Sequence, residues 1–492
     1  MKISIQQAGI QSIDRDAIII NLFEGVTTPG GATGVVDKAL DGAISELIEA
    51  GDLSGKLGNV TVLYPRGAVP ADRVVVVGLG KQEDFSLESV REAAAVAIKQ
   101  VSKLGVSTVA TIVHGGGIGD LEVNAAAQAV VEGSLLALYQ YPKPAGHKDE
   151  NSDSPPESLT VVEFDHTKIE AVEAGAKAGQ IIAESVYLAR TLVNHPSNII
   201  TPTGLAEAAQ TMAAEVGLRC RVLDEAEMQA QNMNALLAVT KGASEPAKFI
   251  ILEHQPDLAG QPIVLIGKGV TFDTGGYWLK PTTAQSGMKS DMAGAAAVIG
   301  AVRAIALLDL PLHVVGLVPA AENMISDTAY KTEDVYVAKN GVSVEILSTD
   351  AEGRLLLADA LNYAADLDPA VVIDIATLTS GKVVALGERI TAIFASDDAL
   401  YEALFAAGAR VNEPLWRLPL DPRFDRQLKS EVADLKNSGG SQGHPILGGR
   451  FLAHFVGDWA WAHLDIAGDA LYHGGPTQTR CSYLTKGATG KP

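Results

Sequence analysis

Short apolar runs with the length of buried strands alternate with helix-like stretches along most of this 492-residue chain. In its first part the strand-like runs are DAIIINLFEG, NVTVLYPRG, RVVVVGLG and STVATIVHG, and the helix-like stretches are GVVDKALDGAISELIEAG and SLESVREAAAVAIKQVSKLG. Parallel strands need long crossover connections, which are usually helices, so this alternation favours an α/β fold. Continuous apolar strands also predict sheets that are covered on both faces.

The chain is longer than a single hydrophobic core usually becomes, so two domains are expected. A polar, proline-rich segment at 142–158 separates the first region from one more strand, LTVVEFD, and from a helical pattern over about 168–194. We place the joint near His166 and predict an N-terminal α/β domain over 1–166, with a role in assembly or regulation. A larger α/β domain over 167–492 is expected to carry the chemistry, on a mixed sheet flanked by helices.

The second region repeats the alternation of strands and helices. Strands are expected at AKFIILEH, PIVLIGKG, LHVVGLVPA, VSVEILST and AVVIDIATL, with helices at DMAGAAAVIGAVRAIALL and RLLLADALNYAADL. The stretch from Ala293 to Ala321 is the most membrane-like part of the chain, but Arg303, Asp309, Pro311 and His313 interrupt it. This pattern predicts a buried helix followed by a strand, and no transmembrane segment.

Cysteine content and net charge limit which cellular compartment and which binding partners are expected. Only Cys220 and Cys481 occur, which excludes a disulfide framework and a multi-cysteine zinc site and favours a reducing cytoplasm. The start, MKISIQQAGIQ, lacks the basic and apolar segments of a secretory signal, so we expect a cytoplasmic protein. A formal net charge of −21 disfavours attraction to phosphate backbones, so nucleic acid is not an expected partner.

Three charged segments follow predicted strands or open predicted helices. They are GKGVTFDTGGYWLKP, with Lys268, Asp273 and Lys280; MKSDMAGAAAV, with Asp291; and STDAEGRLLLADA, with Asp350, Glu352 and Arg354. Ligands of open α/β sheets bind beyond the carboxyl ends of the strands, and buried charged side chains need partners. We therefore expect these side chains to converge on one site.

Four carboxylates at one point would repel one another and raise one another's pKa unless cations intervene. Two divalent ions would balance their four negative charges, so the segments predict a two-metal site. A buried lysine beside two such ions can lose its proton and become a neutral nitrogen ligand, which Lys268 could do. This ligand set is compatible with either zinc or manganese. Because the sequence contains no HExxH or GxxxxGK[ST] motif, and no GxSxG elbow between a predicted strand and a predicted helix, zincin, serine hydrolase and P-loop NTPase functions are not supported.

The three charged segments resemble the core motifs of the leucyl aminopeptidase (cytosol aminopeptidase) family, and STDAEGRL is close to its signature. The resemblance continues through DIATLTSGKVVALG, LKSEVADLKNSGG and WAHLDIAG, and covers most of the chain from about Leu188 onward. The N-terminal half resembles the family in layout only. The resemblance implies a metal-dependent aminopeptidase that assembles as a homohexamer and acts on peptides with a free N-terminus.

Carried over motif by motif, the resemblance also implies the metal ligands. Asp273 and Glu352 are expected to bridge both ions. Asp350 then completes the more exchangeable site, and Lys268 with Asp291 completes the tighter one.

Lys280 and Arg354 are the catalytic residues that the resemblance implies outside the ligand set. Water activated by the two metals is expected to attack the peptide carbonyl, while Lys280 and one metal stabilise the developing oxyanion. Arg354 is expected to hold a bicarbonate that acts as the general base. Coordination of the substrate's free α-amine by a metal would restrict cleavage to the N-terminal residue.

The side-chain pocket departs from the family pattern. Met288 and Thr377 match pocket positions, whereas Ser380 stands where the family usually has Gly. Tyr277 and Trp278 stand where smaller residues are commoner. Added bulk in a pocket changes which side chain fits by roughly 1 to 3 kcal/mol per methylene-sized difference, so an altered residue preference is expected.

Three further features are assigned no chemical role. Asp374 inside VVIDIATL is interpreted as a hydrogen-bonded anchor, and neither His463 nor any other histidine is assigned to metal. The VVVVGLGK stretch at 74–81 lacks the rest of a nucleotide fingerprint and is interpreted as a tight turn. Two alternative functions remain open: a DNA-binding regulator, either non-catalytic or in addition to catalysis, and a dimetal phosphoesterase.

Overall fold

The computed structural model describes residues 1–116, 121–143, 154–472 and 481–490. Most of the proline-rich segment predicted to precede the domain joint therefore lies outside the described residues. The chain divides into two compact units, one formed mainly by Met1–Glu184 and the other mainly by the residues from Ser185 onward. Each unit is an α/β structure with its own core, so the predicted fold class is confirmed.

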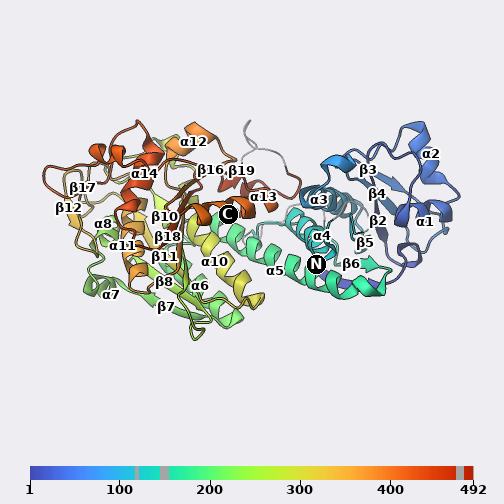
Figure 1. Cartoon of the computed structure of the whole chain (residues 1–492), viewed down its shortest axis with the longest axis horizontal. Helices are drawn as coiled ribbons and strands as arrows, with labels where there is room; N and C mark the ends of the chain where they lie inside the picture. Colours follow the sequence, from blue (N-terminus) through green and yellow to red (C-terminus); the bar gives the residue numbers. More distant parts are fainter. Residues whose placement is uncertain (117–120, 144–153, 473–480, 491–492) are drawn as a thin grey trace. The chain divides into compact units, whose positions relative to one another are not determined.

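The N-terminal unit is built on a six-stranded sheet. Its strands run in the order β1 (Lys2–Gln7), β6 (Ser158–Glu163), β5 (Thr108–Ile112), β2 (Ala17–Leu22), β4 (Val74–Gly78) and β3 (Val60–Leu63). All neighbours are parallel except β3 and β4. One face is covered by α1 (Gly31–Ala39) and α2 (Ala43–Ala50), and the other by α3 (Leu87–Lys103) and α4 (Val123–Ala137) (Figure 1).

The stretch GVVDKALDGAISELIEAG forms two helices, whereas its apolar spacing suggested one. The chain breaks between α1 and α2 because Gly42 adopts the left-handed conformation, with φ of 90°. Asp37 makes this break stable: its Oδ1 accepts hydrogen bonds from the backbone of Ile44 at 2.8 Å and of Ser45 at 3.0 Å. These bonds satisfy amides at the start of α2 that have no partner within the helix.

A long helix, α5 (Ile169–Asn194), contributes to both units. In the first unit it lies close against α4, since a methyl group at Gly175 would meet the Asn124 carbonyl oxygen at 2.0 Å. In the second unit its continuation contacts α10 (Ala293–Leu307), where a methyl group at Gly300 would lie 3.0 Å from the Ser185 carbonyl oxygen. The joint predicted near His166 coincides with the start of this helical segment, and the compact units divide later, within α5.

The second unit is built on a nine-stranded mixed sheet. Eight strands run in the order β16 (Leu415–Arg417), β15 (Thr391–Ala395), β18 (Ala460–Asp465), β14 (Val371–Ala376), β9 (Ile263–Gly267), β11 (Val314–Asn323), β8 (Lys248–His254) and β7 (Arg219–Leu223), and β10 (Gly269–Asp273) pairs with β11. The central strands β18, β14, β9 and β11 are parallel to their neighbours in this group, as is β10 to β11. Their carboxyl ends therefore meet at one edge of the sheet.

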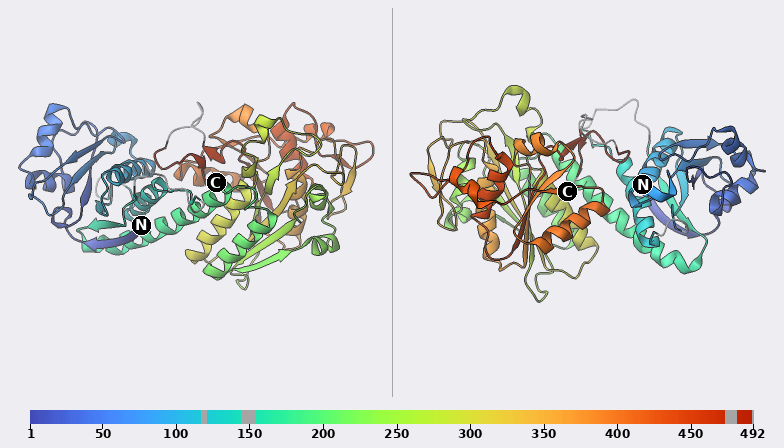
Figure 2. Two further views of the ribbon diagram at one scale, coloured as in Figure 1. Left: turned by 180° about the vertical axis from the view of Figure 1, so that it is seen from behind. Right: turned by 45° about the horizontal axis from the view of Figure 1, so that its top comes forward.

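Helices cover both faces of this sheet, as the continuous apolar strands predict. The helices α8 (Asn234–Thr240), α11 (Gly353–Ala365) and α14 (His444–Ala453) pack on one face, and α6 (Pro202–Val216), α10 and α13 (Asp398–Arg410) pack on the other (Figure 1). Figure 2 shows the same layers from two further directions. The stretch Met288–Leu307 is long and apolar enough by composition to cross a membrane, but 67% of its most apolar window is buried inside the protein, as in the core helix of a soluble protein.

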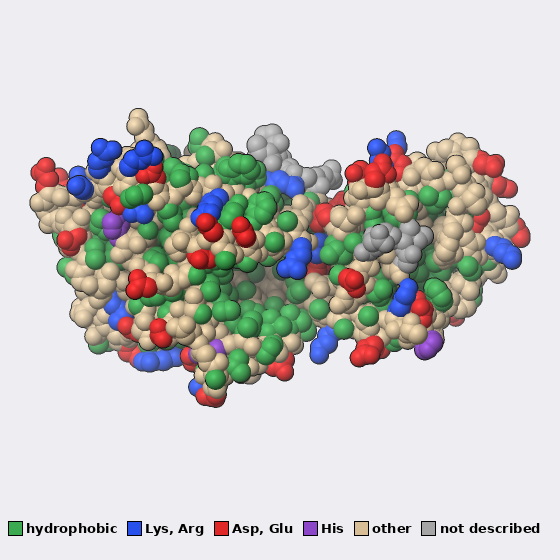
Figure 3. Space-filling view, in the orientation of Figure 1, with side chains coloured by type: hydrophobic (Ala, Val, Ile, Leu, Met, Phe, Trp, Pro, Cys, Tyr) green, Lys and Arg blue, Asp and Glu red, His purple; other side chains and the backbone are tan. Residues whose placement is uncertain are grey.

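One predicted strand lies outside the main sheet. VSVEILST contributes only β13 (Ser343–Glu345), which pairs with β12 (Val335–Val337) and β17 (Leu435–Lys436) in a separate three-stranded sheet. On the face shown in Figure 3, Lys and Arg side chains lie singly or in small groups among Asp and Glu side chains. This face therefore offers no continuous basic surface to a nucleic-acid backbone.

Candidate active site

The carboxyl ends of neighbouring strands bring the charged segments together. Lys268 directly follows β9, Asp273 ends β10, and Thr377 directly follows β14. The pairing of β9 with β14 continues beyond the strands, where the Lys268 amide donates to the Ile375 carbonyl at 3.0 Å. The site therefore lies at the edge of the sheet that topology predicts for ligand binding.

Three carboxylates form a compact cluster at this edge. One carboxylate oxygen each from Asp273, Asp350 and Glu352 lies within 4.8 Å of the other two. Asp273 and Glu352 are buried, and Asp350 is partly exposed. Glu352 immediately precedes α11, so the helix start fixes the backbone from which it projects.

Lys268 and Asp291 occupy the buried side of the cluster. The Lys268 ammonium group lies 2.8 Å from Asp291 Oδ2 and 2.8 Å from Glu352 Oε1, and it donates to the Thr377 carbonyl at 3.1 Å. The Thr377 hydroxyl in turn donates to Asp291 Oδ1 at 2.7 Å. Burial disfavours the charged ammonium, but Asp291 and Glu352 raise the pKa of Lys268 above its ordinary value.

Lys280 lies on the other side of the cluster, between two of its carboxylates. Its ammonium group is 2.7 Å from Asp273 Oδ2 and also contacts Asp350 Oδ1. Burial opposes the charge on Lys280, but Asp273, Glu352 and Asp350 together raise its pKa. The five predicted metal ligands and Lys280 are thus brought together by the fold.

The two lysines leave the four carboxylates only partly neutralised, with a formal net charge of −2. Burial and repulsion by Glu352 raise the pKa of Asp273 to about 6. Burial also raises the pKa of Asp291 well above its ordinary value. Burial would raise the pKa of Glu352 too, but Lys268 and Lys280 lower it to about 2. Glu352 Oε2 is buried and has no hydrogen-bond partner among the described residues.

Arg354 lies in the first turn of α11 and is 2% exposed. Its Nη1 donates to the Asn437 carbonyl at 2.8 Å, and its guanidinium lies 5.8 Å from the centre of the Phe451 ring. Its Nε is buried and has no hydrogen-bond partner within the described part of the chain. Burial lowers the pKa of Arg354 to about 10, so the group remains a cation at neutral pH.

The three predicted pocket residues lie on segments that carry the site. Met288 begins the short helix Met288–Ser290, which directly precedes Asp291, and Thr377 is hydrogen-bonded to Asp291. Ser380 is exposed and begins α12 (Ser380–Leu386). The Asp465 side chain fixes the approach to α12, because it accepts hydrogen bonds from the backbone of Leu378 and Thr379.

Sequence reasoning did not select Asn323, although it ends β11 beside Asp273 in the parallel pairing of β10 and β11. Its amide nitrogen donates to Asp273 Oδ1 at 2.8 Å. The signal available in the sequence was a polar residue at the end of a continuous apolar strand, the same signal that drew attention to Lys268.

Asp374, which the sequence analysis assigned no chemical role, makes well-defined contacts in the structure. Asp374 is fully buried, pairs with the His463 ring and accepts a hydrogen bond from Trp461 Nε1 at 2.7 Å, which agrees with its interpretation as an anchor.

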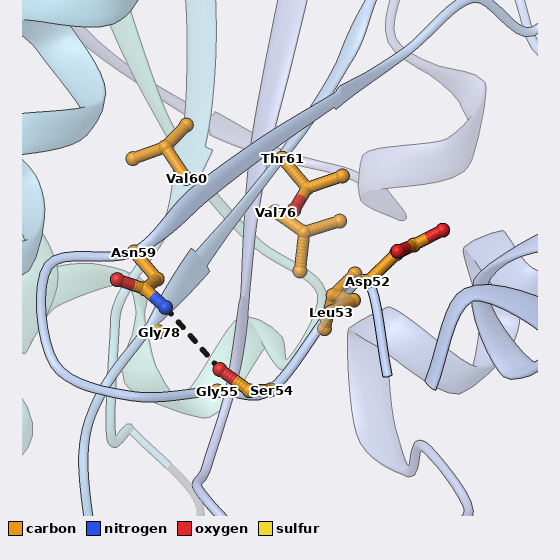
Figure 4. A pocket seen from close by; sticks show the side chains of 9 residues that line it. All are labelled: Asp52, Leu53, Ser54, Gly55, Asn59, Val60, Thr61, Val76 and Gly78. Atoms are coloured by element: carbon orange, nitrogen blue, oxygen red, sulfur yellow. Dashed lines mark hydrogen bonds between the residues drawn. The ribbon is translucent and has the colours of Figure 1, made fainter. Parts of the chain in front are cut away.

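In the N-terminal unit, Gly78 of the VVVVGLGK stretch borders a cavity of about 160 Å³ (Figure 4). Its lining residues are Asp52, Leu53, Ser54, Gly55, Asn59, Val60, Thr61, Val76 and Gly78. A lining with one Asp and no Lys or Arg does not suit a phosphate group.

Comparisons with known proteins agree with this arrangement. The model of the cytosol aminopeptidase family catalytic domain matches residues 187–492, and that of the family's N-terminal domain matches residues 19–143. A probable cytosol aminopeptidase of Geobacter sulfurreducens is 40% identical over 492 residues, covering 100% of this chain and 97% of the relative. A probable cytosol aminopeptidase of Geotalea uraniireducens is 42% identical over 459 residues, covering 92% of this chain and 90% of the relative.

Solved structures show the same similarity. The bottromycin maturation enzyme BotP in complex with Mn is 34% identical, with a TM-score of 0.84, over 97% of this chain and 96% of that chain. A mutant of tomato leucine aminopeptidase is 30% identical, with a TM-score of 0.84, over 100% of this chain and 94% of that chain. The family matches span both units, and full-length relatives share two-fifths of the sequence, so the chain belongs to the cytosol aminopeptidase family and is a metal-dependent hydrolase of the aminopeptidase class.

Proposed function

We propose that this aminopeptidase uses two divalent ions held by Lys268, Asp273, Asp291, Asp350 and Glu352. The observation that carries the proposal is the largely buried cluster of four carboxylates that two lysines neutralise only in part. Divalent cations would supply the missing positive charge, and two of them balance the four negative charges of the carboxylates once Lys268 is a neutral ligand and Lys280 faces the substrate. Glu352 Oε2, which has no hydrogen-bond partner among the described residues, offers a ligand atom. Residues and ions therefore fit each other chemically.

The donor set of carboxylate oxygens with one lysine nitrogen suits Mn²⁺ or Zn²⁺. The manganese in the BotP complex, on a similar fold, supports Mn²⁺ as the first ion to test. When bound, such ions supply Lewis acidity, which lowers the pKa of water and polarises the peptide carbonyl. The Lys268 ammonium would have to give up its proton to serve as a ligand.

The chain's own cations act on the reacting peptide. Lys280, held between Asp273 and Asp350, is suited to stabilise negative charge that develops on the carbonyl oxygen of the cleaved bond. Arg354 is suited to hold a bicarbonate as general base, since its guanidinium is buried and charged and its Nε has no hydrogen-bond partner among the described residues. Both groups are fixed by their contacts before substrate arrives.

The substrate class we propose is peptides with a free N-terminus, whose first side chain enters a pocket formed by Met288, Thr377 and Ser380. The position of Met288 and Thr377 beside Asp291 supports this role. By resemblance to the family, we also propose a cytoplasmic homohexamer. Light scattering coupled to size exclusion tests the assembly, with a mass six times the 51.3 kDa of one chain expected.

The decisive experiment is hydrolysis of a leucine anilide and of its N-acetylated form by metal-stripped protein, before and after addition of Mn²⁺ or Zn²⁺. We expect cleavage of the free-amine substrate alone, and only with metal. Cleavage of the acetylated substrate would contradict the exopeptidase assignment. Full activity in the metal-stripped protein would contradict the role of the carboxylate cluster.

A further inference from the structure

A second layer of polar side chains lies behind the carboxylates. Asn323 and Thr349 are fully buried, and Tyr330 is 1% exposed. The Asn323 amide nitrogen lies 2.8 Å from Asp273 Oδ1 and 2.9 Å from the Thr349 carbonyl oxygen. Because both neighbours are acceptors, the nitrogen of the amide, and not its oxygen, must face them.

These contacts fix the orientation of the Asp273 carboxylate. Its Oδ1 accepts from Asn323 Nδ2 at 2.8 Å and from the Gly275 amide at 2.8 Å. Two donors on one oxygen prevent the carboxylate from rotating, and they leave Oδ2 as the atom that faces Lys280. The direction of this carboxylate is thus set by uncharged donors of the protein.

Thr349 connects the same group to the segment that carries Asp350. Its carbonyl oxygen accepts from Asn323 and from the Tyr330 hydroxyl at 2.7 Å. Its own hydroxyl donates to the Gly275 carbonyl at 2.6 Å and accepts from the Trp278 amide at 2.7 Å. Thr349 therefore joins the segment that carries Asp273 to the segment that carries Asp350. It does so through its hydroxyl and, by way of Asn323, through its carbonyl oxygen.

The group is tightly packed as well as hydrogen-bonded. Gly276 has φ of 60°, and a methyl group there would lie 2.9 Å from the Thr349 side chain. Asn323 Oδ1 is buried without a hydrogen-bond partner among the described residues, which costs free energy that an apolar residue of similar size would avoid. The two hydrogen bonds that Asn323 Nδ2 donates must offset this cost. The Asn323 amide therefore has to keep a defined position against Asp273 and Thr349.

We propose that Asn323, Thr349 and Tyr330 form a positioning clamp that holds Asp273 and Asp350 at metal-binding separation before the ions bind. This inference rests on the proposed two-metal function. Lys280 offsets part of the repulsion between these two carboxylates, and the uncharged donors of the clamp fix their direction when no ion is bound. Partners that orient a metal ligand typically change metal affinity by roughly 10- to 100-fold when they are removed.

The test is Asn323→Leu in the full-length, metal-stripped protein, which removes the donors at nearly constant side-chain size. Isothermal titration with Mn²⁺ is expected to show roughly 10- to 100-fold weaker binding than in the wild type. Tyr330→Phe should weaken binding in the same direction and by less, since Asn323 still donates to the Thr349 carbonyl. Excess Mn²⁺ should restore leucine anilide hydrolysis in Asn323→Leu, which it could not do for a misfolded protein.

Asn362→Leu is the matched control, because Asn362 is a buried asparagine of α11 in the same unit whose Nδ2 has no hydrogen-bond partner among the described residues. Its Mn²⁺ affinity should equal that of the wild type. Wild-type affinity in Asn323→Leu, or equal weakening in Asn362→Leu, would overturn the clamp. A wild-type protein that binds no Mn²⁺ would overturn the two-metal function itself.

Discussion

The Lys280 ammonium group lies 2.7 Å from Asp273 Oδ2, so the two ends of one glycine-rich loop meet. The loop turns back through Gly275 and Gly276, which have φ of 85° and 60°, and the Lys280 amide donates to the Thr274 carbonyl at 2.9 Å. The catalytic cation that we propose is thereby held against a proposed metal ligand. Neither group can move far without breaking the loop.

Replacement of Lys280 by Met should separate catalysis from metal binding. The methionine fills similar space without charge, so the developing oxyanion loses one stabilising partner. We expect kcat on leucine anilide to fall by roughly 10²- to 10³-fold at saturating Mn²⁺. Metal content, measured by mass spectrometry of the purified protein, should not fall. An unchanged kcat would exclude Lys280 from the reaction.

Removal of metal should destabilise the C-terminal unit, because its carboxylates then lack two counter-charges. Differential scanning calorimetry should show a higher melting temperature with Mn²⁺ than with chelator, and about 2.7 kcal/mol of added stability at a hundred times the dissociation constant. Glu352→Gln, which weakens the cluster's charge, should reduce this increase. An increase of the same size in Glu352→Gln would argue that Mn²⁺ binds elsewhere.

The N-terminal unit contains a histidine that should make its stability depend on pH. His114 is fully buried, accepts a hydrogen bond from Asn21 Nδ2 at 3.0 Å through Nδ1, and has no partner for Nε2 among the described residues. Burial lowers its pKa from 6.5 to about 4. Between these values the unfolded chain binds the proton and the folded protein does not, so stability falls as the pH falls.

At pH 5 this loss amounts to about 2 kcal/mol relative to pH 8. His114→Gln, which has no titrating group, should lack that part of the pH dependence. Chemical denaturation of both proteins between pH 8 and pH 5 measures the difference. Equal pH dependence in the two proteins would show that the pKa of His114 does not differ between the folded and unfolded states.

Much of the fold and most of the candidate site followed from the sequence, because both depend on local patterns. The apolar runs at 263–267 and 371–376 predict buried strands, and charged residues directly behind such strands predict a site. Asn323 also follows an apolar run, but its contact with Asp273 depends on the pairing of β10 with β11, which no local pattern reveals.

Two other differences between the prediction and the structure have similar causes. The break between α1 and α2 depends on the side chain of Asp37, which bonds to residues several positions ahead. The division of the chain within α5 could not be read from the sequence, since the helical pattern is continuous while its two halves pack on different units. In each case the deciding interaction joins residues that are distant in the sequence or on different elements.

The residue preference should differ from a leucine-first order. Ser380 adds a side chain at the start of α12, while Tyr277 and Trp278 are 51% and 60% exposed on the loop that carries Lys280. We expect the ranking of kcat/KM for Leu, Ala, Met and Gly substrates to change, by roughly 10-fold or more per methylene-sized difference. Ser380→Gly should shift the ranking toward leucine. A leucine-first ranking in the wild type would contradict this prediction.

Gly353→Ala tests whether Lys268 must occupy its observed place. Alanine favours a helix over glycine by roughly 0.5 to 1 kcal/mol, so at the start of α11 the substitution should not unfold the protein. Its methyl group, however, would lie 2.5 Å from Lys268 Cε and 2.6 Å from Nζ. Lys268 is 2% exposed and held by Asp291, Glu352 and the Thr377 carbonyl, so it can yield only by giving up those contacts.

We therefore expect metal-free Gly353→Ala to fold but to melt at a lower temperature than the wild type, because Lys268 loses buried ion-pair contacts. Mn²⁺ affinity and leucine anilide hydrolysis should both fall at least 10-fold, because the loss of groups that orient metal ligands already lowers affinity by that much. Gly300→Ala on α10 is the control, because its added methyl group would lie 3.0 Å from the Ser185 carbonyl and touches no proposed ligand. That variant should lose stability without losing metal affinity. If Gly353→Ala binds Mn²⁺ as tightly as the wild type, Lys268 does not take part in holding the ions.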